Sequence, residues 1–172
     1  VPTAVMAATG RAAELGLLIK GGEALQRAHE VDTIVFDKTG TLTVGRPELL
    51  AVHTVPGWTT TGLLHTPSTD DAQTLLALAA ARERASEHPI GFAIVTAADA
   101  RGAARLSTEA VENVPGHGMH GIVESDAVQI GNAALLTDSY GLDLSPLAAT
   151  AAAEAALGRT VVHVGVNGRY AG

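Results

Sequence analysis

Residues 34–43 read Ile34-Val35-Phe36-Asp37-Lys38-Thr39-Gly40-Thr41-Leu42-Thr43, an apolar run that ends abruptly in a carboxylate and a polar loop. The run from Val31 to Phe36 predicts a buried strand of a parallel sheet, with Asp37 at its carboxyl end, where ligands bind in such sheets. A carboxylate in that position can act as a nucleophile that accepts a phosphoryl group. For an Asp considered by itself, the competing interpretation is a residue that caps a turn at the strand end.

The heptapeptide from Asp37 to Thr43 resembles the phosphorylation motif of the P-type ATPases, whose fold is similar to that of the haloacid dehalogenase superfamily. The resemblance implies that Asp37 forms an aspartyl-phosphate beside Lys38. It also implies that Thr39 lies next to the phosphoryl group, with its backbone carbonyl on Mg²⁺. Thr39 stands where many phosphatases of the superfamily have a second Asp that acts as general acid and base. Because Thr cannot take that role near neutral pH, we expect a slowly hydrolysed phosphoenzyme, as a pump requires.

The composition indicates a folded, globular chain. Among 172 residues, 47% are apolar and only 17% charged, which is typical of a globular protein. The formal charge of −7 argues against nucleic acid or an anionic membrane as the main partner. There is no Cys, which excludes disulfides and thiolate metal sites, and no run approaches the roughly 20 apolar residues of a membrane span. We expect the chain as given to be soluble.

Two helices are predicted on either side of Ser86-Glu87-His88-Pro89. The first covers residues 70–85, with Thr69 or Asp70 as its cap and an apolar stripe that Glu83 continues. Arg82 and Arg84 are expected to point away from that stripe. Pro89 suits the first turn of the second helix and places His88 at its cap. By themselves, Glu83 suits an ion-paired helix end and His88 a structural cap.

The Ser-Glu-His-Pro sequence resembles the motif of the nucleotide-binding domain in the heavy-metal branch of the P-type ATPases. That resemblance implies that Glu83 and His88 contact the adenine end of ATP. A glycine-rich turn follows at residues 115–121 and is similar to the Gly-X-Gly loop of the same branch. The similarity implies backbone contacts from Gly116 and Gly118 to nucleotide, whereas the turn alone is equally explained by tight geometry. Asn132 is a good helix cap, and by the same resemblance it contributes to the nucleotide pocket.

The predicted fold class is α/β, namely an α+β nucleotide-binding domain with an antiparallel sheet flanked by helical hairpins, preceded by a partial haloacid-dehalogenase-like phosphorylation domain. The breaker cluster Gly45-Arg46-Pro47 predicts the boundary, so that residues 1–46 begin the phosphorylation domain and residues 47–172 form the nucleotide-binding domain. Residues 1–9 show no pattern, and Trp58 is expected near the tip of a loop. The remaining predicted helices are 10–18, 23–29, 133–140 and 144–157, and the remaining strands are 48–55, 108–114, a hairpin over 122–130 and a last hairpin from 160 onward.

The resemblance implies a function for this chain as the cytoplasmic, ATP-binding portion of a heavy-metal P-type ATPase in the cell membrane. ATP and Mg²⁺ are its expected cofactors, and the transported metal, with copper favoured, is handled by membrane segments that have no match here. We expect the chain by itself to bind adenine nucleotide without completing catalysis. The unpaired strand 31–36 is expected to offer an edge for self-association. The alternatives are an isolated nucleotide-binding module and a phosphatase of the haloacid dehalogenase type that uses Asp37.

Overall fold

The computed structural model describes residues 2–37, 41–43, 45–58 and 70–172. By its internal contacts the chain divides into two units, Val1–Gly45 and Arg46–Gly172, and each is described by itself. The division falls within the predicted breaker cluster at residues 45–47. The identity of the two units as phosphorylation and nucleotide-binding domains stays a prediction.

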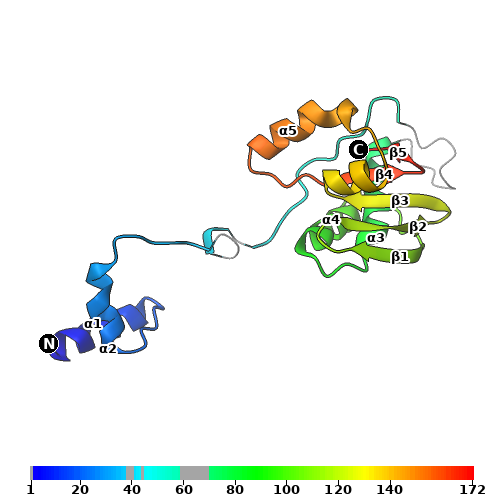
Figure 1. The fold of residues 1–172 in the computed structure, drawn as a ribbon. Coiled ribbons are helices and arrows are strands. Elements are labelled where there is room, and N and C mark those ends of the chain that lie inside the picture. The colour runs from blue at the N-terminus through cyan, green and yellow to red at the C-terminus, as the bar shows by residue number, and fades with distance from the viewer. Residues whose placement is uncertain (1, 38–40, 44, 59–69) are drawn as a thin grey trace. The chain divides into compact units, whose positions relative to one another are not determined.

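The first unit begins with helix α1 (Pro2–Glu14), followed by α2 (Gly22–Arg27) and a short 3₁₀ turn at Ala28–Glu30 (Figure 1). The prediction of a helix over residues 10–18, after a featureless start, is therefore wrong in its bounds. Residues 2–14 are rich in Ala, the best helix former, which explains why the helix begins so early. Gly16, with φ of 79°, follows the helix in the left-handed conformation that commonly terminates one.

The predicted strand Val31–Phe36 is not formed. The segment has no regular secondary structure and its apolar side chains are exposed, with Ile34 at 69% and Val35 at 90% of their full accessibility. Among the described residues no strand pairs with it, and an isolated extended segment cannot satisfy its backbone hydrogen bonds. Asp37 lies at the end of this exposed segment. Pairing of residues 31–36 with a second copy stays a prediction.

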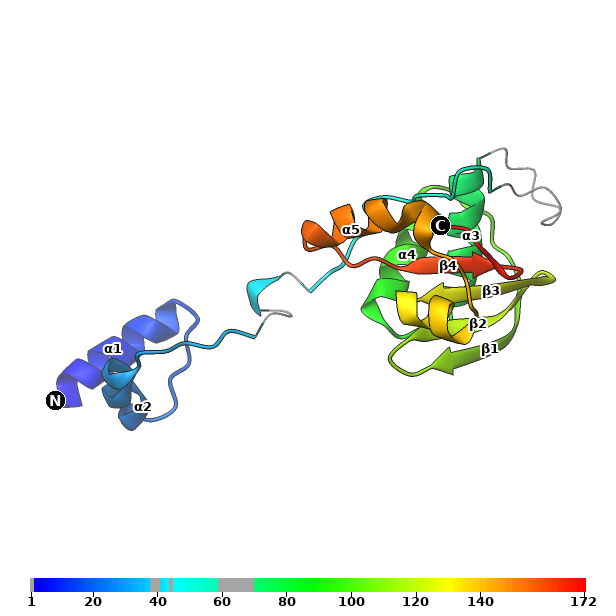
Figure 2. The same ribbon diagram turned by 45° about the horizontal axis from the view of Figure 1, so that its top comes forward.

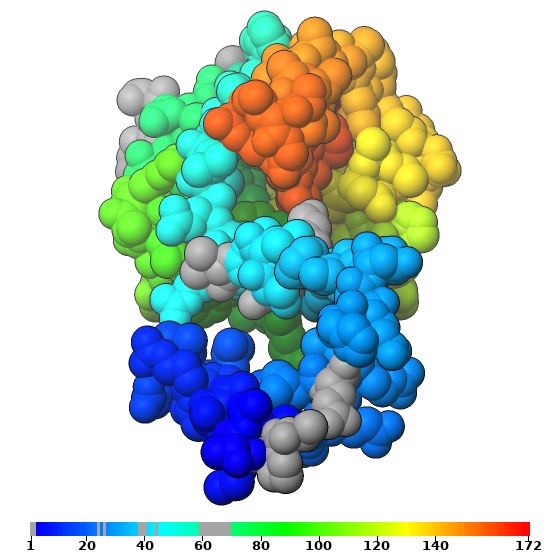
Figure 3. Space-filling model, turned by 90° about the vertical axis from the view of Figure 1, so that its left-hand side faces the viewer, coloured from blue at the N-terminus to red at the C-terminus, as the bar shows by residue number. Residues whose placement is uncertain are grey.

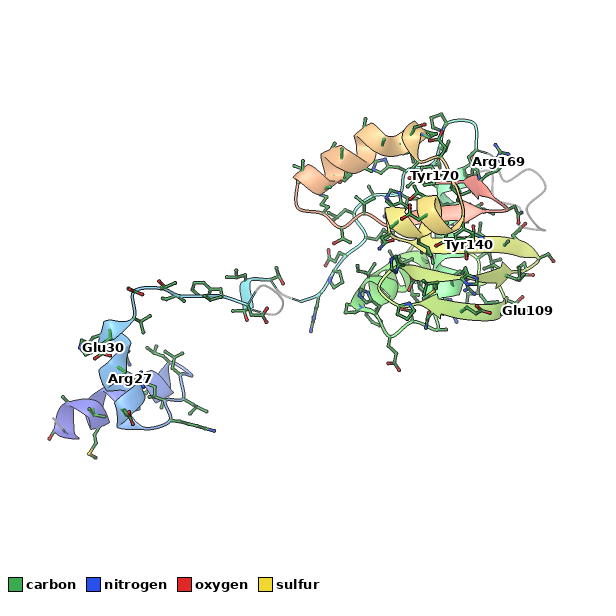
Figure 4. All side chains as sticks on the ribbon, viewed as in Figure 1. Arg27, Glu30, Glu109, Tyr140, Arg169 and Tyr170 are labelled. Carbon is green, nitrogen blue, oxygen red and sulfur yellow. The ribbon has the colours of Figure 1, made fainter. Side chains whose placement is uncertain are left out.

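The second unit is built on a five-stranded antiparallel sheet in the order β1-β2-β3-β4-β5. The strands are β1 (Thr108–Val114), β2 (Gly118–Val123), β3 (Asp126–Gly131), β4 (His163–Val166) and β5 (Arg169–Tyr170). The strand at 108–114 and both hairpins confirm the predictions. Asn167 and Gly168 both have positive φ, 49° and 73°, which suits the tight turn that Asn-Gly favours between β4 and β5. Figure 4 marks Glu109 on β1 and Arg169 on β5, which are exposed on the two edge strands.

Helices α3 (Asp71–Glu83) and α4 (Pro89–Ala100) cover one face of this sheet (Figures 1 and 2). The side chain of Asp70 caps α3 by accepting hydrogen bonds from the N–H groups of Ala72 and Gln73, as the sequence predicted. The main core lies between these helices and the sheet. It contains Leu75, Leu76, Leu78, Ala79, Ile94, Met119, Val128, Ile130, Val164 and Val166.

The other face of the sheet carries a second, smaller core. The chain leaves β3 through a turn of π-helix at Leu135–Ser139 and a 3₁₀ turn at Ser145–Leu147, and then forms α5 (Ala148–Ala156). Leu135, Leu136, Leu142 and Tyr170 form this core. Helix α5 buries none of its residues, and its orange surface lies on the outside of the unit in Figure 3. An apolar cavity of about 410 Å³ separates it from residues 47–53, bridged by a His53–Glu154 pair at 3.6 Å.

Two further predictions for the second unit are wrong. Residues 48–55 are extended without forming a strand, although the Val55 N–H donates to the carbonyl of Ala171 at 2.9 Å. Trp58, expected near a loop tip, is only 4% exposed and packs in the main core. A large indole gains more free energy from burial than any other side chain in this segment, which explains why it is drawn inward.

A buried polar pair joins the last two strands. The ring Nδ1 of His163 lies 2.9 Å from the hydroxyl of Tyr170, the residue marked in Figure 4, and both side chains are more than nine-tenths buried. Burial lowers the pKa of His163 from its usual 6.5 and raises the pKa of Tyr170. A proton on His163 is therefore unfavourable in the folded unit.

We predict that the second unit loses stability in mild acid because of His163. The unfolded chain binds a proton near pH 6.5, whereas the folded chain binds it only at lower pH. The stabilisation is therefore complete above pH 6.5 and is lost as the pH falls, by up to about 1.4 kcal/mol per pH unit. Urea unfolding between pH 5 and pH 8 should show this slope, and His163→Gln should remove most of it. An unchanged slope in that variant would show that other groups are responsible.

Candidate functional site

Glu83 lies in the last turn of α3 with only 9% of its side chain surface exposed. Burial raises the pKa of its carboxyl, against a hydrogen bond with Ser86 and the charges of His88 and Arg82, which lower it. Its Oε2 faces Gly91 in the first turns of α4, where an added Cβ would stand 2.2 Å away. A larger residue at position 91 would displace this carboxylate, so the glycine permits the close approach seen here. The site therefore holds a buried carboxyl group at the junction of two helices.

His88 is the cap of α4, as the sequence predicted. Pro89 keeps it in extended geometry, with φ of −76° and ψ of 136°, and its ring Nδ1 accepts from the N–H of Ile90 at 3.2 Å. In a neutral ring the proton must then be on Nε2. The cap thus fixes the tautomer of an exposed imidazole and leaves Nε2–H as a donor for a ligand.

The end of the sheet supplies a second group of predicted residues. Asn132 donates through Nδ2 to the carbonyl of Gly116 at 3.2 Å, and its Oδ1 accepts from the N–H of Leu135 at 2.9 Å. Its own N–H donates to the carbonyl of His117 at 2.8 Å. Asn132 therefore fixes the Gly116–Gly118 turn to the start of the next helical turn.

Two glycines allow the strands behind this turn to come together. A Cβ on Gly118 would stand 2.1 Å from the carbonyl oxygen of Ile130, and one on Gly131 would stand 2.2 Å from that of His117. Gly131, like Gly91, was not among the predicted site residues. Glycine weakens both helices and strands, so a glycine inside a predicted helix or strand could have indicated a position where the backbone is closely approached.

The structure thus arranges Glu83 with His88, and Gly116 and Gly118 with Asn132. Helix α3 packs on the face of the sheet that carries Met119 and Ile130, and α4 packs against α3. Gly118 and Gly131 face Leu135 of the second core. One group offers a buried carboxylate and an imidazole N–H, and the other a turn of backbone without side chains. A planar heterocycle with donors and acceptors along one edge matches these features.

One charged residue contradicts its prediction. Arg82, expected to point away from the apolar stripe, is fully buried at 0% exposure. Its Nη2 donates to the backbone carbonyl of His120 in β2. Arg84 does remain on the outer side and pairs with Asp99 at 2.6 Å. The sequence pattern alone could not show that Arg82 is buried and Arg84 exposed, because the hydrogen-bond partner of Arg82 lies in β2, far along the chain.

The predicted phosphorylation residues belong to the first unit. Asp37 is exposed at the end of the extended segment, and Lys38 and Thr39 lie outside the described residues. Within the described ranges no three His, Cys, Asp or Glu side chains gather to hold a metal ion. Mg²⁺ requires near-octahedral oxygen ligands, which Asp37 does not provide by itself. In the part of the chain that the structure describes, no helix has both the length and the apolar character to cross a membrane.

Comparisons with known proteins agree on one family. A model of the haloacid dehalogenase-like hydrolases matches residues 31–172. The probable copper-exporting P-type ATPase V of Mycobacterium tuberculosis (strain H37Rv) is 43% identical over 171 residues, which is 99% of this chain and 21% of that protein. Copper-transporting ATPase 1 of Rhizobium meliloti is 41% identical over 170 residues, 99% of this chain and 19% of that protein. The chain therefore spans about a fifth of the length of these relatives.

Solved structures give the same result. A zinc-transporting PIB-type ATPase in the E2.Pi state matches 97% of this chain and 25% of its own, with a TM-score of 0.68 and 33% identity. The N-domain of HMA8, a copper-transporting P-type ATPase, matches 73% of this chain and 94% of its own, with a TM-score of 0.53 and 26% identity. The chain belongs to the haloacid dehalogenase-like hydrolases, and its homologues in that family are heavy-metal P-type ATPases.

Proposed function

We propose that residues 46–172 bind ATP through Glu83, His88, Gly116, Gly118 and Asn132. The observation that carries the proposal is the buried carboxylate of Glu83 next to the exposed imidazole of His88. A buried carboxylate lowers stability unless a donor satisfies it. Burial raises the pKa of Glu83 although Ser86 is its hydrogen-bond partner, so a ligand that donates to this carboxylate would favour its charged form.

The edge of adenine complements this arrangement. Its exocyclic amine can donate to the carboxylate of Glu83, and a ring nitrogen can accept from Nε2–H of His88. The Gly116–Gly118 turn, which Asn132 holds in place, presents backbone to the rest of the nucleotide. Guanine carries an oxygen in place of that amine and would face the carboxylate with an acceptor, so the site should prefer adenine.

The wider proposal is that the chain is part of a heavy-metal P-type ATPase that exports copper across the cell membrane, with this portion on the cytoplasmic side. The DKTGTLT sequence at residues 37–43 and the copper-exporting relatives support it. In that protein Asp37 would accept the phosphoryl group of ATP, with Lys38 beside it, and Mg²⁺ would draw on Asp37 and Thr39. The transported metal would be bound by membrane segments elsewhere in the protein.

Two alternative functions differ in whether the chain releases phosphate from a substrate. A phosphatase of the haloacid dehalogenase type would liberate phosphate from a substrate through Asp37. An isolated nucleotide-binding module would bind ATP without any release. Since Thr39 replaces the second Asp that such phosphatases often use, we favour binding without turnover for this chain by itself.

We predict that Glu83→Gln weakens ATP binding while stabilising the fold. The amide cannot accept as strongly from the adenine amine, so calorimetric titration should show a loss of about tenfold in affinity. The same change removes a buried charge, so the free energy of unfolding at pH 7 should rise by about 1 kcal/mol. Glu109→Gln, which changes an exposed carboxylate of β1 in the same way, is the matched control and should leave ATP affinity unchanged. Unaltered affinity in the Gln variant would place the nucleotide elsewhere.

His88→Asn separates capping from recognition. Asn is among the best helix caps, so α4 and the melting temperature should be preserved. The variant lacks the Nε2–H donor, and we expect ATP affinity to fall by about tenfold. Competition with GTP should show a smaller ratio of ATP affinity to GTP affinity in this variant than in the wild type. Equal ATP affinity in the two proteins would mean that His88 is only a structural cap.

A further inference from the structure

Arg82 is the largest side chain that the second unit buries completely. Its only hydrogen bond among the described residues is the one from Nη2 to the carbonyl of His120, and its Nε and Nη1 have no partner there. Burial lowers the pKa of the guanidinium, while the charge of Glu83 raises it. A buried and incompletely paired cation costs folding free energy, so its position calls for a functional explanation.

The guanidinium lies against an irregular part of the sheet. The pairing of β1 with β2 shifts between Glu109 and Glu112, where Ala110 has φ of 48°. A Cβ on Gly121 would stand 2.3 Å from the carbonyl oxygen of Ala110 and 2.8 Å from both Nη atoms of Arg82. The bulge and the bare Gly121 therefore provide the space into which the guanidinium fits.

Two halves of the proposed nucleotide site meet at this residue. Arg82 directly precedes Glu83 in α3, and its bond partner His120 is two residues beyond Gly118 in β2. The connection from Glu83 to the glycine turn thus passes through one side chain and one hydrogen bond. We propose that Arg82 is a positioning residue, which sets the distance between Glu83 and the Gly116–Gly118 turn.

This inference rests on the proposed ATP site and deepens it. The charged or titratable groups that act on Glu83 are Arg82 on its own helix and His88 at the start of α4, with the hydroxyl of Ser86 as a hydrogen-bonding partner. The exposed Arg84 is directed to Asp99 instead. The charge of Arg82 lowers the pKa of Glu83, whereas burial raises it. Without that charge the pKa of Glu83 should rise, so that Glu83 takes up its proton at higher pH.

The test compares Arg82→Met with Arg84→Met by titrating ATP at a series of pH values from 5.5 to 8. We expect Arg82→Met to bind ATP about tenfold more weakly at pH 7, as supporting residues typically do when removed. Its affinity should also begin to fall at a higher pH than in wild type, whereas Arg84→Met should change neither quantity. His88 is present in all three proteins, so the difference between their profiles reports Glu83. Because Met fills the site without a buried charge, the melting temperature should not fall.

A structural role alone predicts a different pattern. If Arg82 only stabilised the fold, Arg82→Met would lower the melting temperature and leave the pH profile of ATP affinity where it is, and that result would overturn the inference. If the Met variant does not fold, Arg82→Lys decides, since Lys keeps the charge but lacks the guanidinium fork. We expect Lys to retain the wild-type pH profile with weaker binding, and wild-type affinity in Lys would contradict the positioning role.

The two proposals fail in distinguishable ways. Wild-type protein that binds no ATP would overturn the nucleotide site and this inference together. Loss of binding in Glu83→Gln with unchanged binding and pH profile in Arg82→Met would overturn the role of Arg82 alone.

Discussion

Helix α3 ends in two adjacent buried charges, Arg82 and Glu83, and the second unit is arranged so that both can be accommodated. The preceding turns of the helix are apolar and fix its packing on the sheet, so that Arg82 is fully buried and Glu83 is only 9% exposed. The guanidinium of Arg82 donates a hydrogen bond to a backbone carbonyl of β2. The carboxyl of Glu83 forms a hydrogen bond with Ser86 and lies against Gly91 in the first turn of α4. The free energy gained by burying the apolar side chains of α3 thus offsets the cost of burying Arg82 and Glu83.

Close backbone approach is the second condition on which the site depends. Gly91, Gly118, Gly121 and Gly131 each stand where a single Cβ would meet another atom at 2.3 Å or less. Their roles differ. Gly91 leaves space for the carboxylate of Glu83, and Gly121 leaves space for the guanidinium of Arg82. Gly118 and Gly131 allow β2 and β3 to approach each other next to the Gly116–Gly118 turn. Since glycine is otherwise unfavourable inside helices and strands, these positions trade local stability for access.

Local patterns in the sequence predicted the second unit well, because its helices and strands carry their own signals. The Asp70 cap, Pro89 after His88 and the Asn167-Gly168 turn each act within a few residues. Long-range packing was not accessible in this way. Burial of Trp58 and Arg82 depends on partners far along the chain, and the extended state of residues 31–36 depends on the lack of a neighbouring strand among the described residues. The candidate site residues came from motif resemblance, and no periodicity would have joined Glu83 to Gly118.

The central claim is that adenine nucleotide binds at Glu83, His88 and the Gly116–Gly118 turn, and not in the apolar cavity beneath α5. Backbone amide NMR shifts recorded during addition of ADP to the wild-type chain test it most directly. The account predicts that the perturbed amides cluster at residues 82–92, 116–121 and 131–135. Shifts concentrated at residues 47–53 and 150–162, with the glycine turn undisturbed, would contradict it.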